Sequence, residues 1–497
     1  MLAGLEENKM SNKQKKKGSA DDLPMMQKIV GLCKRRGFIF QSSEIYGGLK
    51  SAYDYGPLGV ELKRNVMNEW WRNMVHERED VVGLDASIIM SPKVWRASGH
   101  VGGFSDPLVD CKICKARFRA DKAPAVEPGS EVKYRTKGKT IVGTADRAYV
   151  CPECGSPELS EEREFNLMFR TNLGPIDSDD STVYLRPETA QAMFVNFLNV
   201  QQTYRMQLPF GIAQQGKSFR NEITVEHFIF RSCEFEQLEM EFFCEPDDSD
   251  RWLDYWKEER FNWYVNLGAK KEHLRLRPHE ADELAHYAKA CYDIEYEYPW
   301  GWDELEGVAN RTDYDLRKHQ EASGKKLTYF DPQKTNPETG KQGMHFHPYV
   351  IEPAGGATRA VLMFLLDAYD EEPPSEGRKD GRVVLRLHPR LAPIKVAVLP
   401  LVKKDEWLTG KARDIVKGFW SNSVNAFYDE KDAIGRRYAR QDEAGTPFCI
   451  TVDGQTKEDD TVTLRHRDDM RQERIKAGEA VDIVNAELRK WIFRHNS

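Results

Sequence analysis

Residues 218–244 read SFRNEITVEHFIFRSCEFEQLEMEFFC, and their pattern carries the clearest structural signal in the chain. The second half alternates polar and apolar side chains, which is typical of a strand with one buried face. One face holds Phe235, Gln237, Glu239 and Glu241, and the other holds Leu238, Met240 and Phe242. The first half predicts a preceding strand on which Arg220 and Glu222 share a face. Together the polar faces predict a cleft, although an ordinary half-exposed sheet with surface charges would give the same pattern.

The side chains of this predicted cleft suit a nucleotide. An arginine binds phosphate charge, an aromatic ring stacks on a base, and carboxylates hold a metal ion or an amine. This combination, rather than any one residue, makes the stretch a candidate binding site.

A long helix and a short strand are predicted on the N-terminal side of this stretch. Residues 55–77 open with Gly56-Pro57, and apolar residues then recur at every fourth position: Leu58, Leu62, Val66, Trp70 and Met74. Val81–Met90 has the composition of a strand, which Pro92 ends. On the C-terminal side, residues 347–369 predict a strand, a Gly355-Gly356 turn and an apolar helix.

Composition indicates several folded domains and excludes a membrane-spanning helix. The chain has 497 residues, 40% of them hydrophobic, and a formal net charge of −7. Its mean hydropathy is −0.66, and it has no run of about 18 apolar residues. The polar N-terminus lacks the apolar core of a secretory signal. Residues 1–22 predict a disordered basic tail.

The C-terminal part differs from the rest in charge and in pattern. Residues 371–381 have the composition of a linker, and strand–helix alternation follows from Ile394. Residues 393–497 carry 19 Lys and Arg against 18 Asp and Glu, which permits contact with nucleic acid without requiring it. Its basic cluster contains Arg436, Arg437, Arg440, Arg465, His466 and Arg467, which fit RNA contact, a solvated basic face or, for part of the segment, a structural feature between domains.

Four of the nine cysteines form two Cys-x-x-Cys pairs, Cys111 with Cys114 and Cys151 with Cys154. The pattern predicts a structural Zn²⁺ ion with four thiolate ligands in an insertion over residues 110–157. The 36 residues between the pairs exceed the usual spacing, so free cysteines and a redox pair remain as alternatives. His345 and His347 alternate as strand residues do, which we favour over a metal site.

Three segments in a fixed order resemble the class II aminoacyl-tRNA synthetases. Phe-Arg-x-Glu, a loop and Arg-x-x-x-Phe are similar to motif 2, whereas residues 55–92 resemble the dimer-interface motif 1 and Glu352–Arg359 resemble motif 3. The resemblance extends to glycyl-tRNA synthetase of the homodimeric type, over about residue 25 to the end. The segments that carry it are Ser42–Gly48, Tyr53–Gly59, Ala97–His100, Leu185–Gln191, Phe235–Glu239 and Gly435–Tyr438.

The resemblance implies an α+β fold and a domain order. A six-stranded antiparallel catalytic sheet flanked by helices would span residues 23–109 and 158–390, with 246–345 partly an insertion. A zinc-ribbon-like insertion would occupy 110–157 and an α/β anticodon-binding domain 393–497. The implied activity is ATP-dependent ligation of glycine to tRNA(Gly) through a glycyl-adenylate, with Mg²⁺, in a cytoplasmic homodimer.

The resemblance also implies a role for individual residues. Arg220, Glu222 and Arg359 would be catalytic, with Arg220 bridging the α-phosphate and the glycine carboxylate. Phe235 and Arg359 would sandwich adenine, Glu222 would hold its amino group, and Arg231 and Arg311 would bind terminal phosphates or carboxylate. The full ATP set is Arg220, Asn221, Glu222, Phe230, Arg231, Phe235, Glu304, Leu305, Arg311, Gly356 and Arg359. The glycine set is His100, Glu188, Gln237, Glu239, Glu352 and Ala354.

The sequence departs from the family at three positions. Ala354 stands where many bacterial relatives have serine, Thr358 replaces an acidic residue before Arg359, and Ala192 replaces a glycine. Two alternatives therefore stay open: a non-catalytic synthetase-like binding protein, and a synthetase for a different small amino acid.

Overall fold

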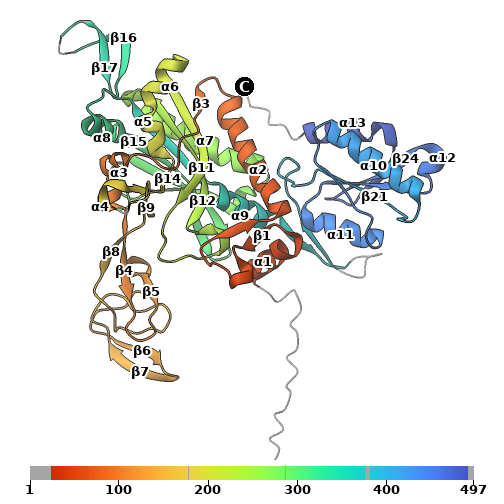
Figure 1. Ribbon diagram of the computed structural model, residues 1–497, viewed down its shortest axis with the longest axis horizontal. Helices are drawn as coiled ribbons and strands as arrows, with labels where there is room; N and C mark the ends of the chain where they lie inside the picture. The colour runs from red at the N-terminus through yellow and green to blue at the C-terminus, as the bar shows by residue number, and fades with distance from the viewer. Residues whose placement is uncertain (1–23, 177, 286, 338, 375–380, 491–497) are drawn as a thin grey trace, which may run out of the picture.

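The computed structural model describes residues 24–490 except 177, 286, 338 and 375–380 (Figure 1). The basic tail predicted over residues 1–22 lies outside this range. No helix within the described part of the chain is both long and apolar enough to cross a membrane.

A seven-stranded sheet forms the centre of the main body of the chain (Figure 1). Its strand order is β13-β14-β15-β18-β12-β11-β3. Its strands are β13 (Leu274–Pro278), β14 (Ala290–Tyr298), β15 (Gly301–Thr312), β18 (Tyr349–Gly356), β12 (Glu234–Cys244), β11 (Phe210–Phe219) and β3 (Val81–Gly83). The first six pair antiparallel, as the resemblance implies, and β3 adds a short parallel strand at the edge.

The strand predicted over Val81–Met90 is wrong beyond Gly83. β3 pairs with β11 for three residues only, and Ile89 forms an isolated bridge with Leu185. Arg186 provides the physical reason, since its Nη1 donates a hydrogen bond to the Ala86 carbonyl at 2.9 Å. The Ala86 carbonyl therefore accepts a hydrogen bond from a buried arginine instead of from a neighbouring strand.

Three helices cover the apolar face of the sheet: α2 (Pro57–Trp71), α7 (Ser249–Asn266) and α9 (Ala357–Ala368). Helix α2 continues into a π-helical turn, Arg72–His76, so the predicted long helix is confirmed. Of its predicted stripe, Leu62, Val66, Trp70 and Met74 are fully buried against the core. Leu238, Met240 and Phe242 of β12 belong to the same core, which leaves the polar face of β12 on the other side of the sheet.

A buried ion pair fastens α7 to the sheet. Arg260 of α7 donates from Nε and Nη2 to the two carboxyl oxygens of Glu306 on β15, at 2.7 and 3.2 Å. The Tyr264 hydroxyl donates to the same carboxylate at 2.7 Å, and both charged side chains are 0% exposed. Such a pair holds its geometry because breaking it leaves a charge without compensation.

The remaining elements of the body connect these layers. They are α1 (Met25–Arg36), β1 (Ile39–Gln41), β2 (Tyr53–Tyr55), α3 (Pro92–Ala97), α4 (His100–Gly103), β9 (Arg170–Asn172), β10 (Thr182–Tyr184), α5 (Ala190–Val195), α6 (Phe197–Tyr204), α8 (Tyr314–Ser323), β16 (Tyr329–Thr335) and β17 (Gln342–Phe346). Helix α5 packs on β11 and β12 from the face opposite α9, and the β16–β17 hairpin projects from the body (Figure 1).

The cysteine-rich insertion extends away from the body, at the lower left of Figure 1. Its strands are β4 (Ser105–Asp110), β5 (Arg117–Arg119), β6 (Glu131–Thr136), β7 (Lys139–Thr144) and β8 (Arg163–Asn166). β4 leads from the body into the insertion, and β8 leads back. The two strands pair antiparallel with each other, and β4 also pairs with β5.

The C-terminal part has its own sheet and its own core. The strand order is β22-β21-β23-β24-β25, with β21, β22 and β23 parallel and the other pairs antiparallel. Its elements are β21 (Val396–Pro400), α10 (Glu406–Ser421), β22 (Ala426–Tyr428), α11 (Ile434–Ala444), β23 (Phe448–Val452), α12 (Thr456–Asp459), β24 (Thr461–His466), β25 (Gln472–Lys476) and α13 (Ala480–Arg489). This agrees with the predicted α/β module.

The linker predicted over residues 371–381 is wrong at its first two residues, and residues 375–380 of it lie outside the described range. β19 (Tyr369–Glu372) and β20 (Arg382–Leu385) pair as an antiparallel hairpin. Arg382 is buried, and its Nε donates to Asp442 of α11 at 2.9 Å and its Nη1 to Glu372 at 2.9 Å. A third bond, to the carbonyl of Arg467, ties the hairpin to the C-terminal domain.

Three of the C-terminal arginines predicted as RNA contacts are structural instead. Arg437, Arg465 and Arg467 are at most 4% exposed. Arg437 Nη1 donates to the carbonyls of Pro400 and Asp429, and Arg465 forms a two-pronged pair with Asp442 at 2.9 Å. These guanidinium groups are buried inside the domain, so both surface interpretations, RNA contact and a solvated basic face, are wrong for these three.

Candidate active site

The polar face of β12 lines a cavity of about 310 Å³. Its walls come from β12, β14, β15, β18, the start of α9, the segments that join β11 to β12 and β13 to β14, and the segment before α5. The lining side chains are Glu188, Arg220, Glu222, Phe230, Arg231, Ser232, Phe235, Gln237, Glu239, His279, Tyr287, Cys291, Asp293, Glu304, Gly307, Ala309, Arg311, Glu352, Ala354, Gly355, Gly356, Thr358 and Arg359. The alternation predicted for β12 is confirmed, because Phe235, Gln237 and Glu239 all reach this cavity.

Arg220 and Glu222 reach the cavity from beyond a strand rather than on one. β11 ends at Phe219, and the backbone N–H of Asn221 bonds to the Leu167 carbonyl at 2.8 Å. The predicted strand position is therefore wrong, although the two side chains still meet at the site. Arg220 is oriented by Nε donation to the Pro187 carbonyl at 3.1 Å, and its guanidinium lies 5.4 Å from the ring centroid of Phe235.

Arg359, the first-turn residue of α9, is held before any ligand binds. Its guanidinium lies 4.4 Å from the centroid of the Phe230 ring, and Nη1 contacts the Glu304 carboxylate at 3.1 Å and donates to the Glu304 carbonyl at 3.0 Å. A side chain at Gly356 would approach the Arg359 stem at 3.4 Å. These contacts leave a planar cationic surface facing the cavity.

Glu222 has an unsatisfied acceptor at this end of the cavity. Its Oε2 atom is buried without a hydrogen-bond partner among the described residues, and the nearest arginine nitrogen, Nη1 of Arg231, lies 3.9 Å away. Burial raises the pKa of Glu222 against the lowering effect of Arg231 and Arg220. A ligand amino group would satisfy this oxygen.

The other end of the cavity is acidic and centred on Arg311. Arg311 donates from Nη1 to both oxygens of Glu352, at 2.9 and 3.0 Å, and from Nε and Nη2 to Asp315, at 2.8 and 3.0 Å. Glu239 accepts from the backbone and hydroxyl of Thr189. Glu188 accepts from Gln191 at 3.0 Å and lies 3.3 Å from His100 Nε2.

Carboxyl groups outnumber the cations at this acidic end, and this shifts the pKa values of Glu188, Glu239 and Glu241. Burial, Glu352 and Glu188 raise the pKa of Glu239 to about 8. Burial and Glu352 raise the pKa of Glu241 well above its usual range, and neither of its oxygens has a hydrogen-bond partner within the described chain. For Glu188, burial is outweighed by His100, which holds the pKa below its usual range. A cationic ligand would relieve this repulsion.

Four residues of the predicted ATP and glycine sets lie differently from the rest. Leu305 is 1% exposed and packs in the core on the helix-covered face. Asn221 and His100 are not among the lining side chains, and His100 stands behind Glu188, with its Nδ1 2.8 Å from Ser98. Arg311 lines the cavity, but its ion pairs place it at the acidic end rather than beside the Arg231 side chain.

Several lining residues were not predicted from the sequence. Tyr287, His279, Cys291 and Asp293 come from β14 and its flanking turns. The only sequence signal for them is the alternation of Cys291 and Asp293 on one strand face, which ordinary surface strands share.

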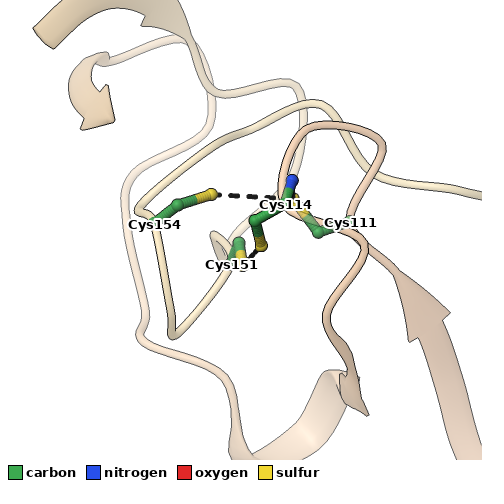
Figure 2. A group of neighbouring side chains, drawn as sticks. All are labelled: Cys111, Cys114, Cys151 and Cys154. Atoms are coloured by element: carbon green, nitrogen blue, oxygen red, sulfur yellow. Dashed lines mark hydrogen bonds between the residues drawn. The ribbon is translucent and has the colours of Figure 1, made fainter. Parts of the chain in front are cut away.

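The four cysteines of the insertion converge, as Figure 2 shows. The Sγ–Sγ distances are 3.7 Å for Cys111 and Cys154 and 3.5 Å for Cys114 and Cys151, and all four sulfurs lie within 4.8 Å of one another. Thiolates on one tetrahedral zinc ion, with bonds of about 2.3 Å, are separated by roughly 3.8 Å. The donor set therefore fits Zn²⁺. His345 lies on β17, 3.2 Å from Thr328, as favoured. His347 lies just beyond the end of β17, so its predicted strand position is wrong, and its Nε2 is 3.2 Å from Gln320.

Comparison with known proteins adds relatives over nearly the whole chain. Residues 395–487 match the family model described as an anticodon binding domain. A protein from Treponema denticola named glycine–tRNA ligase is 52% identical over 472 residues, covering 95% of this chain and 98% of that protein. Its namesake from Lysinibacillus sphaericus is 52% identical over 474 residues, covering 93% and 98%.

Solved structures share the fold at low identity. A prolyl-tRNA synthetase from Giardia lamblia, in complex with prolyl-adenylate, superposes with a TM-score of 0.62 at 14% identity, covering 94% of this chain and 81% of that one. The enzyme from Cryptosporidium parvum, with halofuginone and AMPPNP, gives 0.60 at 13% identity, covering 93% and 77%. At this identity the likeness concerns the fold, and it supports the predicted class II architecture.

Proposed function

Because the chain belongs to the glycine–tRNA ligase family, at 52% identity to relatives of nearly equal length, we propose that it activates glycine with ATP and transfers it to tRNA(Gly). The observation that carries the proposal is the polarity of the cavity. Arginines and aromatic rings surround one end, and carboxyl groups surround the other. A nucleoside triphosphate and an amino acid ammonium are complementary to these two ends.

The first step forms glycyl-adenylate. The glycine carboxylate attacks the α-phosphate of ATP, the bond to the β-phosphate breaks, and pyrophosphate leaves. The substrate supplies the nucleophile, so the protein contributes positioning and charge stabilisation. Arg220 would bridge the α-phosphate and the carboxylate, Phe235 and Arg359 would enclose adenine, and the free oxygen of Glu222 would accept from the adenine amino group.

The remaining predicted residues complete the ATP end. Arg231 would bind the terminal phosphates, beside Phe230 and Gly356. Asn221 and Leu305 belong to the predicted ATP set, and because their side chains do not line the cavity, they would contribute through backbone groups. Mg²⁺ carried by ATP would neutralise phosphate charge, and the carboxylate of Glu304, which is 47% exposed at the cavity, suits it.

Glycine would bind at the acidic end with its ammonium group among Glu188, Glu239 and Glu352, beside Gln237 and Ala354. Arg311 would then balance these carboxylates instead of meeting phosphate, and His100 would orient Glu188. In the second step a terminal ribose hydroxyl of tRNA attacks the glycyl carbonyl, and AMP leaves. Excluding a larger amino acid sterically is easier than rejecting a smaller one, so no editing step is needed.

Amino-acid-dependent ATP–pyrophosphate exchange tests the proposal. We expect exchange with glycine and none with alanine or serine. Exchange with another amino acid would assign the alternative synthetase activity. Absence of exchange with all three would favour the binding-protein alternative, and Ala354 and Thr358 would be the first residues to revert.

Glu188→Ala and Glu239→Gln are expected to raise the KM for glycine at least about tenfold while ATP binding stays measurable, because each change removes a carboxylate that would pair with the glycine ammonium, an interaction worth about 1.5–3 kcal/mol. Glu239, with a pKa of about 8, would ionise as the ammonium binds. Steady-state exchange at varied glycine and varied ATP measures both constants. Asp331→Asn, a carboxylate change on the distant β16, serves as the control. An unchanged KM for glycine would contradict the assignment.

We also propose that the four-cysteine cluster holds a structural Zn²⁺ ion. Cys151→Ser is expected to lower tightly held zinc from about one ion per chain to near zero, because tetrahedral structural sites use all four ligands. Metal analysis after gel filtration measures this, with Cys233→Ser as the matched control. Wild-type chain without zinc would contradict the site.

A homodimer is proposed on the family assignment. Its support in this chain is the exposed apolar segment at the 44–46 turn, where Ile45 and Tyr46 are each 88% exposed and Leu49 is 55% exposed. Exposed apolar side chains grouped in this way are typical of a protein interface. A cytoplasmic location is proposed on the same assignment.

A further inference from the structure

Three side chains of types that can bind metal ions lie together on the cavity wall, and the proposed reaction uses none of them. They are His279, which directly follows β13, and Cys291 and Asp293 of β14. Their ligand atoms all lie within 4.8 Å of one another, and all three residues line the cavity.

Backbone pairing explains why the three side chains meet. Cys291 and Asp293 are two residues apart on one strand and share a face. The His279 N–H donates to the Cys291 carbonyl at 2.9 Å, which sets the imidazole beside them. His279 Nε2 and an Asp293 oxygen form a hydrogen bond at 2.8 Å. Nitrogen and oxygen ligands of one tetrahedral ion are roughly 3.3 Å apart, so the two groups would separate by about 0.5 Å to share an ion.

The donor set selects a chemical class of metal. One imidazole nitrogen, one thiol sulfur and one carboxylate oxygen suit borderline ions such as Zn²⁺, Co²⁺ and Cd²⁺, whereas Mg²⁺ prefers oxygen alone. Three protein ligands leave a fourth tetrahedral position, and the side chains open toward the cavity.

The surrounding charge favours a cation. The carboxyl groups of Asp293, Glu352 and Glu304 surround the Cys291 thiol. The nearest protein cation is Arg277, whose Nη1 lies 3.7 Å from Asp293, but its guanidinium also pairs with Glu283 and Glu295. The wall around the thiol is therefore negative overall.

We propose that His279, Cys291 and Asp293 bind a zinc-class divalent ion, and that this ion inhibits amino acid activation from within the cavity. The register across the sheet runs Asp293, Gly307, Ala354, Glu239, so the ion would lie two strands, or about 10 Å, from Ala354. Its charge and its open coordination position would compete with productive binding of ATP and glycine. The inhibitory part rests on the proposed function, whereas the binding part does not.

The binding test uses the full chain with its four-cysteine cluster loaded with one equivalent of Zn²⁺. Co²⁺ is then titrated while the sulfur-to-cobalt charge-transfer band is recorded. Zn²⁺ binds a given site more tightly than Co²⁺, so the first site stays filled. We expect a saturable band from wild type and from Cys233→Ser, a half-buried thiol outside the cluster, and no band from Cys291→Ser.

Asp293→Asn provides a second variant that keeps the thiol. It is expected to retain the band but to need at least about tenfold more Co²⁺, since loss of even an outer-shell partner costs about 10–100-fold in affinity. A wild type without the band, a band unchanged in Cys291→Ser, or unchanged affinity in Asp293→Asn would each overturn the site.

Inhibition is tested by pyrophosphate exchange with added Cd²⁺, each variant being compared with its own metal-free rate. The inhibition midpoint of Cys291→Ser is expected at least about tenfold above that of wild type. Equal midpoints would overturn the inhibitory part. Absence of glycine-dependent exchange in metal-free wild type would refute the proposed function instead and would leave the cobalt band unaffected.

Discussion

Replacing Arg220 by alanine is expected to lower the rate of glycine-dependent pyrophosphate exchange by about 10²–10³, the usual cost of one preorganised donor that meets developing charge. The guanidinium is fixed by the Pro187 carbonyl at 3.1 Å and lies beside the Phe235 ring, so it is aimed at the cavity before substrate binds. Exchange measured at saturating ATP and glycine reports the loss in kcat.

Two further variants separate the role of Arg220 from general damage. Arg220→Lys keeps the charge but loses the planar pair of donors, so it should recover only part of the rate. Arg317→Ala removes an exposed arginine of α8 that pairs with Asp313, and it should exchange at the wild-type rate. An Arg220→Ala enzyme within about threefold of wild type would contradict charge stabilisation by this residue.

Arg260→Met is expected to lower the free energy of unfolding of the catalytic body by about 3–5 kcal/mol, because it leaves the Glu306 carboxylate buried without its cation. The double variant Arg260→Met/Glu306→Leu should recover most of this loss, since it removes both charges. Trp263 lies 4.6 Å from the guanidinium, so denaturant unfolding followed by tryptophan fluorescence reports on this region.

The matched control is Arg317→Met, which breaks an exposed i,i+4 pair and should cost less than about 1 kcal/mol. Equal losses in the single and double variants would show that packing at this position, rather than the unpaired carboxylate, dominates the stability.

Local patterns in the sequence predicted the helices and strands in which buried side chains recur at regular intervals. The fourfold stripe of α2 and the alternation of β12 both follow from one buried face, and the structure confirms them. The position of Arg220 and Glu222 could not be predicted in this way. The chain there leaves the ladder to bond with the Leu167 carbonyl, a partner more than fifty positions away.

Buried charges were the other point where patterns failed. Arg437 and Arg465 look like surface arginines in the sequence, but the partners that bury them, a strand-end carbonyl and Asp442, are set by packing of α11 on the sheet. His279, Cys291 and Asp293 were missed for the same reason, because pairing of β13 and β14 brings them together. The spacing of residues along the chain does not indicate which side chains of different strands and helices come into contact.

Arg382, on the β19–β20 hairpin, connects the main body to the C-terminal domain and sets their relative position. A buried guanidinium shared between Glu372, Asp442 and the Arg467 carbonyl resists hinge motion, since opening it would strand a charge in the protein interior. These contacts restrict movement of the C-terminal sheet relative to the body that holds the cavity. In the proposed function, a tRNA that contacts both the cavity and the C-terminal domain would have to adapt its own conformation to their relative position.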